Sequence, residues 1–184
     1  NTPGGTLDKA LTKTEVKNIL NAGLKLFAIF QETGSSAKNF TSSTGKTNGQ
    51  KAYDAANELD IIHGSTIYFA VDFDPTDSVI KSNIIPYFES ILSSYAARKY
   101  KIGVYGTRNV CHKLRNQLGI NKFFVSDASY GFSGNLGYIM PDGWCFDQFK
   151  TDITIGSDDG KVSIDKVAVS NRDKGLCISV WFMR

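Results

Sequence analysis

The sequence predicts an α/β fold built on a parallel sheet. Segments rich in β-branched and aromatic residues alternate along the chain with segments of helical periodicity. The connections between successive strands are long enough to be crossovers, which parallel pairing requires. Polar side chains also recur at the ends of the predicted strands. The alternation of strands and helices favours a parallel sheet that is either open or closed into a barrel.

Composition restricts the kind of protein further. The 184 residues fit a single domain spanning residues 1–184, and the 41% hydrophobic content is enough for a large core. The net charge of +3 comes from scattered lysines and arginines, so we expect no nucleic-acid partner. No apolar run approaches the roughly 20 residues of a membrane span. The chain begins at Asn1 without a signal-peptide pattern, so the sequence by itself predicts no location.

The first helix is predicted from its start signal. Thr12 and Glu15 match a capping box, and apolar residues at helical spacing follow until Gly23, which stops the helix. Residues 24–31 are then predicted as a strand, because Leu, Phe and Ile dominate them.

A polar segment separates this strand from the next helix. Residues 35–49 are rich in Ser, Thr, Gly and Lys, and we predict an exposed loop there. Asn48 is expected to cap a helix that continues to about Ile62.

The most informative strand is predicted over residues 65–75. Side chains alternate across a strand, so this one has two faces. One face suits packing against helices and consists of Ile67, Phe69, Val71 and Phe73. The other face consists of Tyr68, Ala70, Asp72 and Asp74. Its two acids lie at the carboxyl end of the strand, where parallel sheets concentrate their chemistry. The alternative for either acid is a turn or capping role, since Asp before Pro is a common turn starter.

The second half of the chain continues the alternation. A helical pattern runs from Asp77 or Ser82 to Lys99, and Pro86 fits it only if the helix begins near Asn83. Strands are predicted over residues 101–105, 121–127, 144–149 and 161–169, a helix over 108–118, and loops over 131–143 and 152–160. The last two strands lack a helix between them. The tail 175–184 is unassigned, and its apolar part, 178–183, fits either an edge strand or a plug.

Polar groups follow or end six successive strands. They are Glu32, Asp72 with Asp74, Tyr105, Asp127, Gln148 and Asp165. Any one of them can be a turn residue, but Gln and Tyr are poor turn formers. The recurrence therefore indicates a ring of polar side chains around a barrel mouth.

Cysteine and histidine suggest no cofactor or metal. Cys111, Cys145 and Cys177 are odd in number and have no CxxC spacing, so one disulfide with a free thiol and three buried thiols are both open. His63 and His112 are too few for a histidine-based metal site, and surface or core roles are expected for them. We expect neither a metal nor a cofactor.

With the strands placed, the chain resembles a bacterial glycoside-hydrolase-like domain of unknown function, a TIM-barrel relative of the family-25 lysozymes (N-acetylmuramidases). The resemblance covers about Leu11 to Gly175 and implies a TIM-barrel-like (β/α) parallel barrel. The matching segments are Ile-Tyr-Phe-Ala-Val-Asp-Phe-Asp at residues 67–74, Lys-Ile-Gly-Val-Tyr-Gly at 101–106, Val-Ser-Asp-Ala-Ser at 125–129, Trp-Cys-Phe-Asp-Gln-Phe at 144–149 and Ser-Ile-Asp at 163–165.

The chain departs from the family pattern at three places. The family opens with a strand carrying an aspartate, and nothing here matches it, so the expected barrel is incomplete at the N-terminus. The lysozymes have Asp-x-Glu where this chain has Asp72 and Asp74, and the shorter Asp reaches less far. The tail after Gly175 has no counterpart.

The resemblance implies a glycosidase that acts on peptidoglycan or a related aminosugar polymer. Asp74 would be the general acid, with Asp72 and nearby aromatic side chains favouring its protonated form. The catalytic set would comprise Asp72, Asp74, Asp127 and Asp165. The substrate-binding set would comprise Glu32, Tyr68, Tyr105, Trp144 and Gln148, with Trp144 as a stacking face.

Two other functions remain open. A glycan- or cell-wall-binding domain that has lost the chemistry is favoured by the departures at the first strand and at Asp74. An interaction module without any carbohydrate role is the third reading, because fold similarity alone does not transfer function. The resemblance also implies a polysaccharide partner and an extracellular or cell-surface location.

Overall fold

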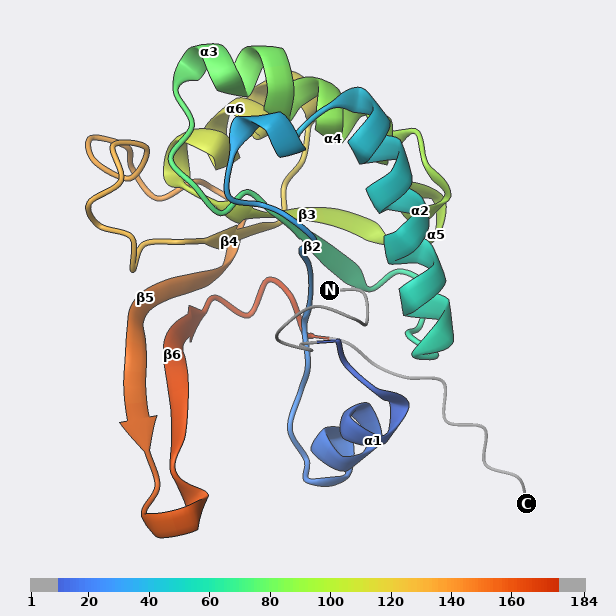
Figure 1. The fold of residues 1–184 in the computed structure, drawn as a ribbon, viewed down its shortest axis with the longest axis vertical. Helices are drawn as coiled ribbons and strands as arrows, with labels where there is room; N and C mark the ends of the chain where they lie inside the picture. Colours follow the sequence, from blue (N-terminus) through green and yellow to red (C-terminus); the bar gives the residue numbers. More distant parts are fainter. Residues whose placement is uncertain (1–9, 176–184) are drawn as a thin grey trace.

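The computed structural model describes residues 10–175. The predicted tail segment 178–183 and Cys177 lie outside the described residues. Within them the chain forms a curled sheet of six strands, a half-barrel, with most helices on one side of it (Figure 1). This architecture confirms the predicted α/β, TIM-barrel-like fold.

The strands follow one another in the sheet in the order of the sequence. They are β1 (Ala28–Phe30), β2 (Thr66–Ala70), β3 (Lys101–Gly106), β4 (Phe123–Val125), β5 (Trp144–Ile155) and β6 (Val162–Val169). The first four pairings are parallel, as predicted. The fifth is antiparallel, because only a short turn containing η3 (Asp158–Gly160) joins β5 to β6. The prediction of a loop from residue 152 was wrong in part, since β5 continues to Ile155.

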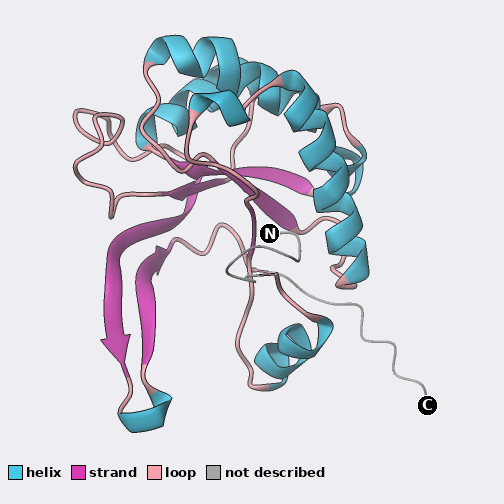
Figure 2. Cartoon of the chain, in the orientation of Figure 1, coloured by secondary structure: helices cyan, strands magenta, loops and turns pink. Residues whose placement is uncertain are grey.

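The helices divide into a covering layer and one outlier. Figure 2 shows them on one side of the sheet, apart from α1 and the short turn at the hairpin tip. The covering layer consists of η1 (Ala37–Asn39), α2 (Ser42–Glu58), α3 (Asp77–Val79), the π-helical turn η2 (Ile80–Ile84), α4 (Ile85–Leu92), α5 (Tyr95–Lys99) and α6 (Arg108–Leu118). The outlier is α1 (Lys13–Asn21), which begins at the predicted capping box of Thr12 and Glu15.

The predicted loop over residues 35–49 was wrong for its second half. Helix α2 starts at Ser42, and Thr41 rather than Asn48 is its N-cap. The glycines that suggested a loop are instead packing positions. A Cβ at Gly45 would lie 2.3 Å from the Tyr87 carbonyl oxygen, so glycine lets α2 approach α4 closely. A local pattern cannot show this contact, since the two helices are distant in sequence.

The helix predicted up to Lys99 is interrupted. Pro86 does lie in the first turn of α4, as expected. The chain then breaks at Ser93 and Ser94 before α5. The Ser94 hydroxyl donates to the Ile91 carbonyl, and such a bond competes with continuation of the helix.

The two predicted faces of β2 are confirmed. Ile67, Phe69 and Val71 lie in the larger core between sheet and helices, on what we call the outer face. Tyr68 lies on the opposite, inner face in a smaller cluster with Phe124, Cys145 and Phe146. Cys111 and Cys145 are both buried free thiols, so residues 10–175 hold no disulfide. Burial raises the pKa of the Cys111 thiol.

Candidate functional site

A chain of hydrogen bonds crosses the inner face at the carboxyl ends of the parallel strands. The Tyr105 hydroxyl donates to Gln148 Oε1 at 2.7 Å. Gln148 Nε2 donates to Asp165 Oδ2 at 2.7 Å, and the Asp152 amide donates to Asp165 Oδ1 at 3.1 Å. Three predicted site residues from three different strands are therefore joined. We call Tyr105, Gln148 and Asp165 the inner-face network.

Strand periodicity explains why these side chains meet. Gln148 follows Phe146 by two residues and so shares its inner face. Gln148 pairs with Val167 across the antiparallel hairpin, and Asp165 is two residues from Val167 on the same face. The hairpin thus brings an acid of β6 beside Gln148 of β5.

Asp72 lies beside this network. It follows Ala70, the partner of Tyr105 in the β2–β3 register, by two residues. Its Oδ2 accepts a hydrogen bond of 3.1 Å from Gln31 Nε2, at the end of β1. Burial raises the pKa of the Tyr105 hydroxyl, and the negative charges of Asp72 and Asp165 raise it further. The phenol is therefore a neutral hydrogen-bond donor on which the charges of two acids act.

Asp74 is engaged differently. Its Oδ2 accepts bonds from the Ser133 amide at 2.6 Å and the Ser133 hydroxyl at 2.7 Å, and its Oδ1 accepts from the Gly134 amide at 2.8 Å. Both oxygens are therefore occupied by the segment 131–143. In this arrangement Asp74 anchors that loop above the end of β2.

Asp127 lies on the outer face. It follows Val125, a residue of the outer core, by two positions. Both of its oxygens accept from the Arg108 guanidinium, with 2.8 Å between Arg108 Nε and Asp127 Oδ1. Arg108 also donates to the Tyr138 carbonyl, so this ion pair holds the first turn of α6 against the loop. The structure does not bring Asp127 into the inner-face network.

Asp147 is a candidate that the sequence reasoning missed. Burial and the nearby charge of Asp127 raise its pKa to about 6, against the opposing effect of Arg108. Its Oδ1 is buried without a hydrogen-bond partner among the described residues. The signal in the sequence was an acid inside the strand segment 144–149, where the alternation places it opposite Gln148.

The other predicted binding residues lie apart from the network. Glu32 forms an ion pair with Lys51 of α2, with 2.7 Å between Lys51 Nζ and Glu32 Oε2. Trp144 packs against the outer core at the first residue of β5, four residues before Gln148. Tyr68 is fully buried on the inner face, and its hydroxyl donates to Asp173 at 2.7 Å. Burial is the main cause that raises the pKa of Tyr68.

Among residues 10–175, no three His, Cys, Asp or Glu side chains are grouped so that they could hold a metal ion. No helix in the same part of the chain is long and apolar enough to cross a membrane.

Residues 1–172 match the model of one protein family, the Rv2525c-like, glycoside hydrolase-like domain. The chain belongs to this family. That membership confirms the resemblance drawn from the sequence segments. The family description is a likeness to glycoside hydrolases, and it specifies neither a substrate nor a reaction.

Two curated relatives come from Bacillus subtilis (strain 168). The chain is 46% identical to the uncharacterized protein YbfG over 169 residues, which cover 88% of this chain and 23% of that protein. It is 41% identical to the uncharacterized protein FadG over 179 residues, which cover 96% of this chain and 31% of that protein. The chain thus spans less than a third of the length of either relative.

Solved structures share the fold. The Mycobacterium tuberculosis Tat-secreted protein Rv2525c, in complex with L-tartrate, superposes with a TM-score of 0.75 at 21% identity, covering 95% of this chain and 82% of that one. An uncharacterized B. stearothermophilus protein gives a TM-score of 0.66 at 12% identity, covering 94% and 81%. At these identities the likeness extends to the fold alone.

Proposed function

We propose that this glycoside hydrolase-like domain binds an aminosugar polymer of the bacterial cell wall, with peptidoglycan as the leading candidate. The observation that carries the proposal is the inner-face network of Tyr105, Gln148 and Asp165, with Asp72 beside it. Sites at the carboxyl ends of parallel strands are where barrel folds bind their ligands. Family membership adds the expectation of a glycan.

The chemistry of the network suits a sugar. Hydroxyl and N-acetyl groups both donate and accept hydrogen bonds, and a site for them needs neutral donors together with strong acceptors. Gln148 carries an amide that can do both, and Asp72 and Asp165 are acceptors. The neutral Tyr105 phenol completes the set and packs edge-on against Phe124, which fixes its ring.

Binding to purified, insoluble peptidoglycan tests this proposal. We expect Gln148→Ala and Asp72→Asn each to lower the bound fraction, with an affinity loss of about fivefold to tenfold from one lost hydrogen bond. Gln117→Ala, on the exposed side of α6, is the matched control and should bind as wild type. Equal binding by all variants would contradict the proposed site.

Cleavage of a glycosidic bond is the second candidate function. Two carboxylates that flank a bound sugar are the usual requirement for such hydrolysis, and the charges of two acids, Asp72 and Asp165, both act on Tyr105. Asp74 remains our candidate general acid, by the Asp-x-Asp likeness to lysozymes. Because its oxygens accept bonds from Ser133 and Gly134, acid catalysis by Asp74 requires those bonds to open.

Mass spectrometry of the soluble products after incubation with peptidoglycan separates the two functions. Muropeptides with new N-acetylmuramic reducing ends, absent with Asp74→Asn and with Asp72→Asn, would establish a muramidase. Binding without products, in a folded protein, would leave the domain as a glycan-binding module.

We also propose that the domain acts outside the cytoplasm. The fold neighbour Rv2525c is a Tat-secreted protein, and a peptidoglycan ligand would itself be found beyond the membrane. Detection of the native protein in the culture medium or the cell-wall fraction would support export, and its recovery in the cytoplasm alone would contradict it.

A further inference from the structure

A pocket lies at the amino ends of the parallel strands β2, β3 and β4, whereas the inner-face network lies at their carboxyl ends. Its volume is about 390 Å³, within the range typical of small-ligand sites. It is bordered by the residues before β2, the first residue of β3, the residue before β4 and the chain after β6. Its lining includes Ser65, Lys101, Lys122, Arg172, Asp173 and Lys174.

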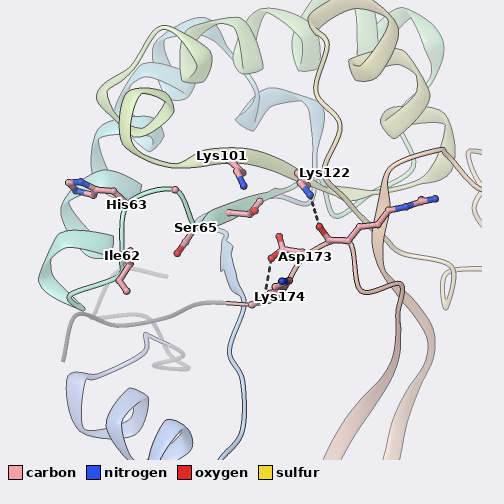
Figure 3. Close-up of a pocket in the computed structure, with 11 residues that line it drawn as sticks. Ile62, His63, Ser65, Lys101, Lys122, Asp173 and Lys174 are labelled. Atoms are coloured by element: carbon pink, nitrogen blue, oxygen red, sulfur yellow. Dashed lines mark hydrogen bonds between the residues drawn. The ribbon is translucent and has the colours of Figure 1, made fainter.

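The pocket is strongly basic. Figure 3 shows the side chains of Lys101 and Lys122 on one side of it and those of Asp173 and Lys174 on the other. Arg172 adds a fourth cationic residue to the lining. None of these four cations forms an ion pair with an acid within residues 10–175. Lys122 does act electrostatically on the Asp173 carboxyl, so four cations and one acid make up the charge of this lining.

The one acid in the lining is already engaged. Burial of the Asp173 carboxyl opposes ionisation, but hydrogen bonds from Thr66, Tyr68 and the Gly175 amide outweigh it together with the charge of Lys122, and the pKa is lowered. The single negative charge of Asp173 stands against four cationic residues in the lining, so the pocket keeps a net positive charge.

Backbone contacts hold the lysines in place. The Lys101 amide donates to the Ser65 carbonyl at 2.8 Å, which fixes the start of β3 beside the start of β2. Lys122 Nζ donates to the Arg172 carbonyl at 2.7 Å, which ties the chain after β6 to the beginning of β4. The cations thus come from three separate segments held at one place.

We propose that this pocket binds a phosphate group. Lysine ammonium groups bind phosphate as point charges, and a doubly charged oxyanion matches several of them better than a single carboxylate does. The volume leaves room for a small organic group attached to the phosphate. Since the pocket lies at the amino ends of the strands, the site is separate from the proposed glycan site at their carboxyl ends.

Isothermal titration calorimetry of the 184-residue chain tests the proposal, with inorganic phosphate and sn-glycerol 3-phosphate as probes and acetate at equal ionic strength as the reference anion. We expect one phosphate site that acetate does not fill. The double variant Lys101→Gln/Lys174→Gln should weaken it by at least about tenfold, because charge-assisted contacts are lost.

The control keeps the change in net charge constant. Lys46→Gln/Lys81→Gln removes two exposed lysines outside the pocket and should leave phosphate affinity unchanged.

Tighter binding of glycerol 3-phosphate would assign the site to an organic phosphate, and tighter binding of the free ion would assign it to inorganic phosphate. No binding of either probe, equal binding of acetate, or equal weakening in both double variants would overturn the proposal. Gln148→Ala should not alter phosphate binding, so failure here is distinguishable from failure of the glycan proposal.

Discussion

Tyr68 and Asp173, 105 residues apart in the sequence, are joined by a hydrogen bond of 2.7 Å. The bond connects the buried aromatic cluster of the inner face to the chain that follows β6. Replacement of Tyr68 by Phe would remove one of the hydrogen-bond donors of this half-buried acid. We expect Tyr68→Phe to lower the free energy of unfolding by about 1–3 kcal/mol. Urea denaturation measures this loss, and Tyr95→Phe, on the exposed side of α5, is the control.

Gly103 is required beside Tyr68. A Cβ at this position would lie 2.6 Å from Tyr68 Cδ1 and 2.8 Å from Cε1. Because the ring is fully buried, it cannot move aside, and we expect Gly103→Ala to destabilise the fold by about 1–3 kcal/mol. Gly131→Ala is the control, since no atom lies within 4 Å of its added Cβ. Equal melting temperatures for the two variants would refute the proposed contact.

Asp74 holds the loop over residues 131–143 through three hydrogen bonds. We expect Asp74→Ala to speed amide hydrogen exchange in that loop, with most of the sheet unaffected. Asp142→Ala removes an acid from the same loop that is 87% exposed, and should change exchange little. If the two variants exchange alike, Asp74 does not anchor the loop.

The raised pKa of Asp147 should make the free energy of unfolding depend on pH. Its pKa in the folded protein is raised from 3.8 to about 6, so the folded state binds its proton more tightly than the unfolded state does. Its favourable contribution is complete below pH 3.8 and is lost as the pH rises through 6. Asp147→Asn should therefore stabilise the protein at pH 7 by about 1 kcal/mol, a value reduced for the partial exposure of the side chain.

Thermal unfolding of wild type and Asp147→Asn between pH 4 and pH 8 checks this expectation. The difference in melting temperature should grow between pH 4 and pH 6 and then level off. A difference that stays constant across this range would show that Asp147 does not titrate there.

Much of the fold was predictable because it depends on local patterns. The alternation of Tyr68 with Phe69 gave the two faces of β2, and the capping box at Thr12 gave the start of α1. The order of strands and helices gave the parallel pairings. The prediction of a loop at Gly45 was wrong, because glycine is needed there for close packing against a helix about 40 residues away in the sequence.

The candidate site was predictable only in part. The positions of Tyr105, Gln148 and Asp165 at predicted strand ends suggested that they share one mouth of the barrel, and hydrogen bonds join them in the structure. Sequence position could not show that Arg108 pairs with Asp127, or that the half-buried Asp147 lies near the charges of that pair. Such partners are set by the way distant segments pack. The proposed roles of Glu32, Tyr68 and Trp144 in binding a substrate stay predictions.

The most direct test of the central claim is the affinity of Tyr105→Phe for soluble peptidoglycan fragments, measured by isothermal titration calorimetry. This change removes only the hydroxyl that donates to Gln148 and keeps the ring packed on Phe124. Tyr95→Phe removes a hydroxyl from α5, away from the network, and serves as the matched control. We predict about fivefold to tenfold weaker binding for Tyr105→Phe and no change for Tyr95→Phe. Wild-type affinity in both variants would contradict the claim that the inner-face network binds a cell-wall glycan.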